Sequence, residues 1–326
     1  MSAGGGTGPS VEVLIPHHTG RERLRRTLES LRRQTVGADA CVIDNGSADG
    51  SPEMIAHDYP EVRLLELGAN RGFGAALNAG ARSSGAATLI LLNNDAEADE
   101  RFVEGLVAAV AEHGVAAGCL RLPDGTIDTA GVQADQSLVA YDHLHGELYP
   151  PARGSEAPLG PCGGAAAFDR ETFLELGGFD EGFFAYLEDV DLAIRLRLSG
   201  IGCVPAPAAF AWHRHAGTLG AGSAGKNRLL GAGRGRLIWK YGPALPASAR
   251  LRGLAIDGIT YAGQIAVDRN AGAIRGRIAE RRRHAGEPRP GIPEGFEAVP
   301  LLQIGTVASL RRRWARGRRY RGGLSR

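Results

Sequence analysis

The sequence contains few of the residues on which several classes of protein depend. Its four cysteines, Cys41, Cys119, Cys162 and Cys203, are far apart and form no CxxC pair. This excludes a zinc ribbon and argues against a disulfide framework, so we expect reduced thiols, as in a cytoplasmic protein. The most apolar run, residues 86–92, is about one third of the length needed to cross a bilayer.

We expect no secretory signal and no membrane span. The N-terminal ten residues are glycine-rich and uncharged, and lack the basic segment and apolar stretch of a signal peptide. We expect residues 1–10 to be flexible. The apolar stretch Leu251–Val267 is interrupted by Arg252 and Asp257. These features predict a cytoplasmic location, with peripheral attachment at the inner face of the plasma membrane as the one membrane contact they allow.

Lysine is almost missing, with two residues, so arginine carries nearly all of the positive charge. Residues 271–326 hold 14 Arg and 4 Glu, a net of +10, which leaves residues 1–270 with a net of −8. A solvated basic extension is the usual fate of such a segment. An anionic surface would also attract it, and Trp314 and Tyr320 among its arginines suit a membrane interface. We favour anionic lipid as the partner over nucleic acid, which the same charge would attract.

The rest of the composition is ordinary for a globular protein, with 43% hydrophobic and 23% charged residues in a chain of 326. It predicts one large domain, alone or with an extension. In the first half, short β-rich runs alternate with segments of helical periodicity, which predicts a parallel sheet covered by helices. We expect strands at Val11–Pro16, Ala40–Ile43, Val62–Leu67 and Thr88–Leu92, and helices at Arg21–Gln34, from Ser51 onward, and at Glu100–His113.

Two of these elements carry finer signals. Ser51 followed by Pro52 is typical of a helix start, with Ser51 as the cap and Pro52 at the first helical position. The run Thr88–Leu92 is entirely apolar after Thr88, which is typical of a central parallel strand. In such sheets, ligands bind at the carboxyl ends of the strands.

Acidic and amide side chains follow two of these strands. Asp44 ends the second strand, and Asn93-Asn94-Asp95-Ala96-Glu97 follows the fourth. Between them, residues 70–80 form a glycine-rich turn into a helix, which is neither GxGxxG after the first strand nor a Walker loop, so dinucleotide and P-loop sites are disfavoured. Carboxylates at a sheet edge suit Mg²⁺ or Mn²⁺ shared with substrate phosphates. From either aspartate alone, a cap of the following helix or turn is the favoured interpretation.

A second acidic cluster follows an aromatic turn. Phe183-Phe184-Ala185-Tyr186 precedes a predicted helix that starts with Glu188 and Asp189. Acids are common in a first helical turn because of the helix dipole, but the aromatic side chains could also wall a carboxylate into a cleft. Further on, His213 and His215 follow a strand-like run at a spacing of two, which would turn one of them inward as a metal or phosphate ligand.

Taken together, six ordered segments resemble those of family 2 glycosyltransferases with the GT-A fold, over about residues 11–243. The set is most similar to bacterial rhamnosyltransferase-like members that build cell-surface polysaccharides. The six segments are the first strand with the helix ending in Leu31-Arg32-Arg33-Gln34-Thr35, then Val42–Ser51, Asn70–Gly74 with Asn78, Leu91–Asp95, Gly178–Glu181 with Glu188–Leu192, and His213–Thr218.

The resemblance implies an α/β fold of GT-A type, a Rossmann-like nucleotide-sugar-binding domain with a mostly parallel sheet flanked by helices. We expect this domain at residues 11–245. A helical, basic C-terminal extension would follow at residues 246–326, either packed on the catalytic domain or autonomous.

The resemblance also implies a donor site. Asp44 matches an aspartate that contacts the base of a nucleotide sugar, while His17-His18 replaces the usual Tyr-Asn after the first strand. Arg234 and Arg236 lie where the family often has an Arg-Asn-Arg run. The expected donor-binding residues are Pro16, Asp44, Asn45, Arg71, Gly72, Asn94, Gly164 and Asp180.

A divalent metal is implied next to the donor diphosphate, either Mg²⁺ or Mn²⁺. Asp95 matches the last acid of a DXD-type motif that binds this metal, and Asn93 stands in place of the first acid. Glu97 and His213 are the further metal ligands that we expect, with His215 as the second choice of histidine.

The implied reaction is inverting transfer of a sugar, rhamnose or another hexose, from a nucleoside diphosphate to a hydroxyl of a saccharide or lipid-linked acceptor. Asp189 matches the catalytic base of the family's Glu-Asp motif, with Glu188 beside it. Asp95 and Asp189 should therefore converge on one cleft.

Two other functions remain open from the residues alone. A nucleotidyltransferase also uses acids at a sheet edge, but residues 17–21 are a faint version of its glycine-rich basic loop. The second alternative is a non-catalytic protein that binds saccharide or anionic polymer through the arginine tail. We expect residues 123–161 to help form the pocket, but they contain no motif that identifies the donor sugar, its nucleotide base or the acceptor.

Overall fold

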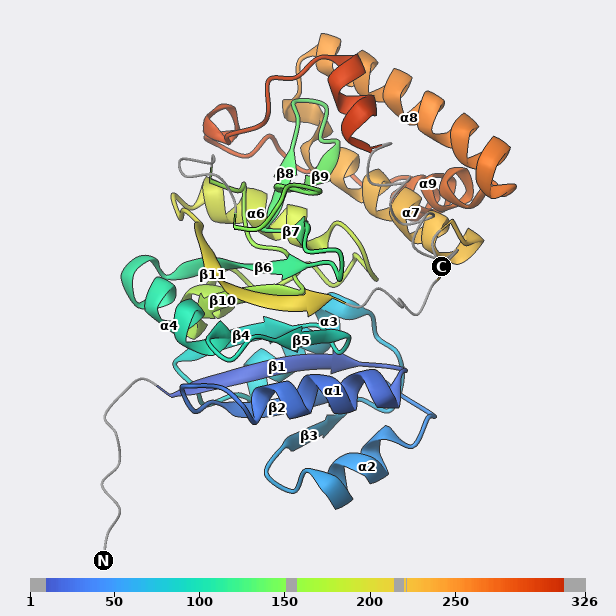
Figure 1. The fold of residues 1–326 in the computed structure, drawn as a ribbon. Coiled ribbons are helices and arrows are strands. Elements are labelled where there is room, and N and C mark those ends of the chain that lie inside the picture. The colour runs from blue at the N-terminus through green and yellow to red at the C-terminus, as the bar shows by residue number, and fades with distance from the viewer. Residues whose placement is uncertain (1–9, 151–156, 214–219, 221, 314–326) are drawn as a thin grey trace, which may run out of the picture.

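The computed structural model describes residues 10–150, 157–213, 220 and 222–313. One sheet crosses the molecule, with helices on both of its faces and a group of C-terminal helices at the top of the view (Figure 1). The predicted flexible N-terminus lies outside the described residues except for Ser10, and so do residues 314–326 of the basic tail.

The N-terminal half of the sheet is parallel, as predicted. Its strands lie in the order β3-β2-β1-β4. At their carboxyl ends, His17 of β1 is paired with Asp44 of β2, and Asp44 with Glu66 of β3. The strands span Val11–His17 (β1), Asp39–Asp44 (β2), Arg63–Glu66 (β3) and Thr88–Leu92 (β4).

The second half of the sheet is mixed. Strand β10 is antiparallel to both β4 and β6, β11 runs parallel to β6, and β5 and β7 pair antiparallel with β11 and β6. The prediction for Thr88–Leu92 is therefore correct for its central, buried place but wrong for the direction of one neighbour. An apolar strand reports burial on both faces, not the direction of adjacent strands. These strands span Ala96–Ala98 (β5), Val115–Arg121 (β6), Ile127–Thr129 (β7), Ala165–Asp169 (β10) and Val204–His213 (β11).

The two faces of the sheet are covered by different helices because successive side chains of a strand point to opposite sides. Val13 and Ile15 of β1 pack in one apolar cluster with α1 and α4, and Leu14 packs in the other with α3 and α5. Helix α6 contributes to both clusters. These helices span Arg21–Leu31 (α1), Phe73–Ser83 (α3), Phe102–His113 (α4), Arg170–Glu175 (α5) and Glu188–Leu198 (α6).

Two helix ends differ from the prediction. Helix α1 ends at Leu31 rather than Gln34, because the Gln34 side chain turns back and its Nε2 donates to the carbonyls of Ser30 and Asp99 at 3.1 and 2.7 Å. Helix α2, Ser51–Asp58, is preceded by Gly50 in the cap position, and Ser51 is not the cap. The Ser51 hydroxyl instead donates to Asp49 at 2.6 Å.

The C-terminal segment is helical, as predicted. Helix α9 packs closely on α7, and α8 forms the outer layer at the top of Figure 1. The small sheet β8–β9 lies beneath α8 and shares an apolar cluster with Ile256. The elements span Val132–Ala134 (β8), Ala140–Asp142 (β9), Ala224–Tyr241 (α7), Gly242–Ala244 (η1), Ala247–Asp268 (α8), Gly272–Arg283 (α9) and Phe296–Ala298 (η2), followed by helical residues 306–313.

The predicted boundary after residue 245 falls between η1 and α8, and it stays a prediction. Among the described residues, no helix combines the length and the apolar content that spanning a membrane would require. All four cysteines are described, buried and free of disulfides, and burial raises the pKa of each thiol to about 12.

Candidate active site

The carboxyl edge of the sheet collects the polar residues that the sequence singles out. Strands β1, β2, β4, β6 and β11 all end at this edge, and the antiparallel β10 begins there with Ala165 opposite Leu92. Asp44, Asn94 and His213 therefore lie at the same edge, although they are up to about 170 residues apart in sequence. In Figure 1, the arrowheads of β1 and β11 point to the right, towards this edge.

Asn45 organises the donor-side loop. Its side-chain Nδ2 donates to Asn70 Oδ1 at 3.1 Å and to the Gly72 carbonyl at 3.0 Å, and its Oδ1 accepts from the Arg71 amide at 2.8 Å. Asp44 is buried beside it and accepts from the Ser47 amide at 3.2 Å. One buried amide thus fixes three successive residues of the glycine-rich loop.

Gly72 lets this loop touch the aromatic turn. Its φ is 97°, and a Cβ at this position would lie 2.4 Å from the Phe184 carbonyl oxygen, so only glycine fits. The adjacent Phe73 amide donates to that same carbonyl at 2.8 Å. On the other side, a Cβ on Gly233 of α7 would lie 2.6 Å from the Tyr186 carbonyl oxygen. The aromatic turn is thus held between the donor-side loop and α7.

The turn itself is strained where it enters α6. Tyr186 and Leu187 have φ values of 72° and 73°, a left-handed conformation that costs about 1–3 kcal/mol for a residue other than glycine. Because both strained residues immediately precede Glu188 and Asp189, the surrounding contacts set the direction in which the two acids leave the helix start.

Glu188 and Asp189 differ in environment. Glu188 is buried, and its Oε2 has no hydrogen-bond partner among the described residues. Burial and the neighbouring Asp189 raise the pKa of Glu188 to about 8, so it holds its proton at neutral pH. Asp189 faces the sheet edge, where its Oδ2 accepts from the Gly163 amide at a long 3.5 Å and its Oδ1 from the Val190 amide at 2.9 Å.

His213 lies between two carboxylates. Its Nε2 is 3.2 Å from Asp95 Oδ1, and its Nδ1 is 2.8 Å from Asp128 Oδ2. Burial alone would lower the pKa of His213, but Asp128 and Asp95 outweigh it and raise the pKa to about 10. Asp128 comes from β7, a strand in the segment for which the sequence offered no motif, so no local signal identified it.

Asp95 and His213 fit part of a divalent metal site. A carboxylate oxygen and an imidazole nitrogen that face each other are donors that Mn²⁺ accepts, and Mg²⁺-type ions in nucleotide enzymes take their remaining ligands from phosphates and water. Within the described residues, no three His, Cys, Asp or Glu side chains form a complete ligand set. Glu97 is half-buried on β5, opposite Trp212, and His215 lies outside the described residues.

A short backbone segment joins the two acidic groups. Asp95 lies in a turn closed by the Ala96 amide, which donates to the Asn93 carbonyl at 3.2 Å. The Asn93 amide donates to the Gly164 carbonyl at 3.1 Å, and the neighbouring Gly163 amide reaches Asp189. Asp189 therefore contacts residue 163 directly, and Asp95 lies in the turn whose Asn93 contacts residue 164, at the same edge of the sheet.

Three of the expected residues have structural partners. Asp180 pairs with Arg236 at 2.8 Å and Lys240 at 2.9 Å; burial opposes ionisation, but these two cations lower the pKa of Asp180 well below its usual range. Arg234 is buried, and it pairs with Asp257 of α8 at 3.1 Å. The structure thus gives Asp180, Arg234 and Arg236 contacts that join α7 to its surroundings.

The other expected donor residues lie along the edge. Pro16 is on β1 opposite Ile43, Asn94 Nδ2 is 2.8 Å from His17 Nδ1, and Arg71 is exposed with its guanidinium on the Leu67 carbonyl at 3.1 Å. His17 is buried, and burial lowers its pKa.

Sequence reasoning missed an aromatic cluster next to this edge. The guanidinium of Arg121, at the end of β6, lies 4.1 Å from the ring centre of Tyr149, 4.7 Å from that of Phe210 and 4.3 Å from that of Trp212. The four side chains come from three separate segments, so no pattern within one segment could have revealed the cluster.

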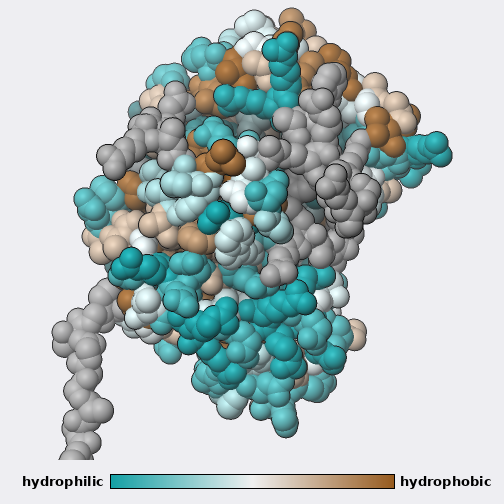
Figure 2. Space-filling view, viewed as in Figure 1, coloured by the Kyte–Doolittle hydropathy of each residue, from teal (hydrophilic) through white to brown (hydrophobic). Residues whose placement is uncertain are grey.

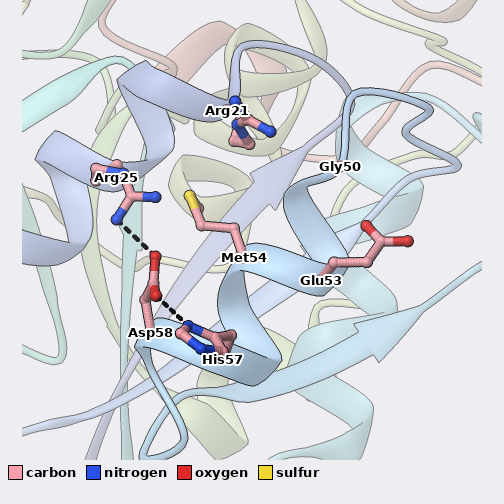
Figure 3. Close-up of a pocket in the computed structure, with 7 residues that line it drawn as sticks. All are labelled: Arg21, Arg25, Gly50, Glu53, Met54, His57 and Asp58. Atoms are coloured by element: carbon pink, nitrogen blue, oxygen red, sulfur yellow. Dashed lines mark hydrogen bonds and ion pairs between the residues drawn. The ribbon is translucent and has the colours of Figure 1, made fainter.

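A separate surface depression lies between α1 and α2 (Figure 3). Its charges already neutralise one another: Arg25 and His57 both contact Asp58, at 2.7 and 2.6 Å. None of the expected site residues lines it; its lining is Arg21, Arg25, Gly50, Glu53, Met54, His57 and Asp58.

Comparison with known proteins gives matches in sequence. Residues 12–177 match the family model described as Glycosyl transferase family 2. The chain is 31% identical over 225 residues to an N-acetylglucosaminyl-diphospho-decaprenol L-rhamnosyltransferase of Mycobacterium tuberculosis, covering 60% of this chain and 73% of that protein. It is 29% identical over 207 residues to the O-antigen biosynthesis protein RfbC of Myxococcus xanthus, covering 59% of this chain but only 16% of that protein.

Solved structures give matches in fold. A structure of GalNAc-T7 with UDP, GalNAc and Mn²⁺ superposes with a TM-score of 0.61 at 17% identity, covering 89% of this chain and 56% of that one. The mannosyltransferase PcManGT of Pyrobaculum calidifontis, in complex with GDP-Man and Mn²⁺, gives a TM-score of 0.54 at 19% identity. The match covers 96% of this chain and 84% of that one. At these identities the likeness is one of fold.

Proposed function

This chain belongs to the family 2 glycosyltransferases and has the GT-A fold, and from that premise we propose that it transfers a hexose from a nucleoside diphosphate sugar to a hydroxyl of a lipid-linked saccharide. Rhamnose is the first sugar to test, because the mycobacterial relative is a rhamnosyltransferase with a lipid-linked acceptor. The observation that carries the proposal is that Asp189 accepts from the Gly163 amide while the turn that holds Asp95 is bonded to the Gly164 carbonyl through Asn93.

In this proposal, the donor nucleotide lies along the carboxyl ends of β1 and β2. Asp44 contacts the base, and the loop of residues 70–72, which Asn45 holds in place through the Arg71 amide and the Gly72 carbonyl, lies beside it. A preorganised loop of this kind reduces the entropy that is lost when the donor binds. Pro16, Asn94 and Gly164 complete the floor.

Asp95 and His213, with Glu97 near them, would hold a divalent cation against the donor diphosphate. When bound, such a cation supplies Lewis-acid stabilisation of the charge that develops on the leaving diphosphate. Asp128 orients His213 by accepting a hydrogen bond from its Nδ1, so that Nε2 is the nitrogen turned towards Asp95. The Nε2 proton would be replaced by a bound cation, in the second-sphere arrangement that is common for metal-binding histidines.

The role of Asp128 is testable without turnover. Asp128→Asn should weaken Mn²⁺ binding, measured by calorimetry or by the Mn²⁺ spin-resonance signal with nucleoside diphosphate present, by about 10- to 100-fold. Asp95→Ala should abolish it. If Asp128→Asn binds Mn²⁺ as tightly as the wild type, Asp128 does not orient His213 for metal binding. If EDTA leaves the affinity for the donor unchanged, the metal does not take part in donor binding.

Asp189 acts as the base. Its carboxylate takes the proton of the acceptor hydroxyl, the oxygen attacks the anomeric carbon, and the bond from that carbon to the diphosphate oxygen breaks on the opposite side, which inverts the configuration. Glu188 stays protonated, so the pair carries one negative charge and Asp189 remains the proton acceptor. Positioned base catalysis of this kind contributes roughly 10²–10⁴-fold.

The proposed function is tested with a panel of nucleoside diphosphate sugars and either Mn²⁺ or Mg²⁺. We expect one donor to raise the melting temperature, and to release its nucleoside diphosphate when a polyprenyl-diphosphate saccharide is added. A nucleotidyltransferase would instead release pyrophosphate from a nucleoside triphosphate. A non-catalytic binding protein would bind saccharide without releasing either product, and that result would contradict the proposal.

A further inference from the structure

Helix α8 has an exposed apolar face. Leu251 and Leu254 are 68% and 61% exposed, and Ile259 and Ile265 are 42% and 47% exposed. The small residues of the same face are exposed as well, and the spacing of three and four places all of them on one side of the helix. We call this the α8 outer face; it consists of Leu251, Leu254, Ala255, Gly258, Ile259, Ala262, Ile265 and Ala266.

The opposite face of α8 is fully engaged. Ile256 is buried against Val139 and Tyr141, and Asp257 pairs with the buried Arg234. Arg252 donates to the Ser137 hydroxyl at 2.7 Å. These contacts fix which side of the helix faces outward, so the apolar face cannot turn inward without breaking a buried ion pair.

The exposed charges of α8, of α9 and of the residues that join them have one sign. In α8, α9 and the residues that join them, every acidic side chain is buried or half-buried, and Asp257 and Glu280 are held in ion pairs. The exposed charged residues of the same stretch are all arginine: Arg250, Arg269, Arg275, Arg281, Arg282 and Arg283. An exposed apolar strip in a stretch whose exposed charges are all cations matches the chemistry of an anionic lipid surface, with acyl chains below a layer of phosphate.

We propose that the α8 outer face docks on an anionic lipid bilayer, lying in the interface with its leucines and isoleucines inserted and the arginines at both ends on lipid phosphates. From Leu251 to Ala266 the face extends about 22 Å at 1.5 Å per residue, enough for an interfacial helix. Brown and tan atoms lie along the upper right of Figure 2, where α8 lies in Figure 1, with teal atoms between them, while the surface over α1 and α2 at the bottom is mostly teal.

A second copy of the chain fits this face less well. Two α8 helices packed antiparallel would bring Arg250 of one copy close to Arg269 of the other, and the stretch has no exposed acid to offset that repulsion. A lipid surface supplies the missing negative charge. The proposal rests on the proposed function only for its purpose, which is to hold the active site near a lipid-linked acceptor.

The test is flotation of the full-length protein with vesicles that contain neither donor nor acceptor, so its result does not depend on turnover. We expect flotation with vesicles that contain phosphatidylglycerol and much less with pure phosphatidylcholine. Leu254→Glu with Ile259→Glu should lower the bound fraction at least tenfold. The matched control is Val36→Glu with Leu148→Glu, which changes two exposed apolar residues outside α8 and should bind like the wild type.

Folding and self-association are measured on the same samples. Retained circular dichroism and donor-induced thermal shift show that the α8 variant is folded. The proposal is overturned if the wild type does not float with anionic vesicles, or if the α8 variant floats as well as the wild type, which would assign binding to another segment. Light scattering that shows a dimer only with an intact outer face, with flotation unchanged by the variant, would assign the face to a second copy.

Discussion

Asp189 and Glu188 are adjacent in sequence and yet have opposite properties. Glu188 is buried, and burial and the neighbouring Asp189 raise its pKa, while Asp189 contacts the Gly163 amide at the sheet edge. The difference follows from the strained turn before them, which directs one acid inward and the other to the edge. Substitutions at the two positions should therefore have different consequences.

We predict that Asp189→Asn lowers transfer by at least about 10²-fold, because asparagine cannot accept the acceptor proton. Donor binding, measured by thermal shift, should survive. Asp39→Asn, at an exposed acid at the start of β2, is the control and should turn over like the wild type. Near-normal turnover in Asp189→Asn would mean that another group is the base.

Glu188 predicts an unusual dependence of stability on pH. Its folded-state pKa of about 8 lies above the ordinary value of 4.5, so between these pH values the folded protein holds a proton that the unfolded chain releases. The free energy of unfolding then falls as pH rises from about 4.5 to about 8, by at most about 1.4 kcal/mol per pH unit from this group. Above about pH 8 this group causes no further loss of stability, because it is ionised in both states.

We predict that Glu188→Gln removes this contribution, so that its stability relative to the wild type is greater at pH 8 than at pH 5. Urea unfolding at both pH values measures the difference. Glu147→Gln, at an exposed glutamate, should follow the wild type at both. A Glu188→Gln curve parallel to that of the wild type would show that Glu188 is ionised in the folded protein.

The elements around the site depend on close backbone approaches. Loop 70–72 and α7 hold the aromatic turn from two sides, each through a glycine whose Cβ would collide with a carbonyl oxygen. Such contacts transmit the position of the donor-side loop to the start of α6, where the base lies.

We predict that Gly72→Ala destabilises the protein by about 1–3 kcal/mol more than Gly68→Ala. Both glycines have positive φ, but a Cβ on Gly68 would meet nothing within 4 Å, whereas one on Gly72 would meet the Phe184 carbonyl. The comparison, made by urea unfolding, isolates the collision from the backbone strain. Equal losses would show that loop and turn move independently.

Across the molecule, the C-terminal helices are joined to the sheet domain by buried ions. Arg234 of α7 pairs with Asp257 of α8 and donates to the carbonyls of Leu138 and Ser137, next to β9. Removal of one partner of such a pair leaves a buried charge without compensation.

We predict that Asp257→Ala lowers the free energy of unfolding by about 3–5 kcal/mol, and that Arg234→Met with Asp257→Leu recovers much of the loss. Unfolding followed by tryptophan fluorescence reports on both regions, because Trp212 is on β11 and Trp239 on α7. A small loss in Asp257→Ala would indicate that α8 is joined to the rest mainly by apolar contacts.

Local patterns were enough to predict the parallel half of the sheet, the helix-strand alternation and the acids that follow β2 and β4. Hydrophobic periodicity repeats within a few residues, so a strand such as Thr88–Leu92 can be read directly from the chain. The resemblance of ordered motifs then pointed to the family that the comparisons establish.

Long-range contacts could not be predicted in this way. The pairing of Asp128 with His213 joins residues 85 apart, and the antiparallel pairing of β10 with β4 joins residues such as Ala165 and Leu92, which are far apart in sequence. The apolar face of α8 also escaped prediction, since the same leucines could have been core residues. Which carboxylate reaches a histidine, and which side of a helix stays uncovered, depends on how distant segments pack, and a periodicity within one segment carries no information about that.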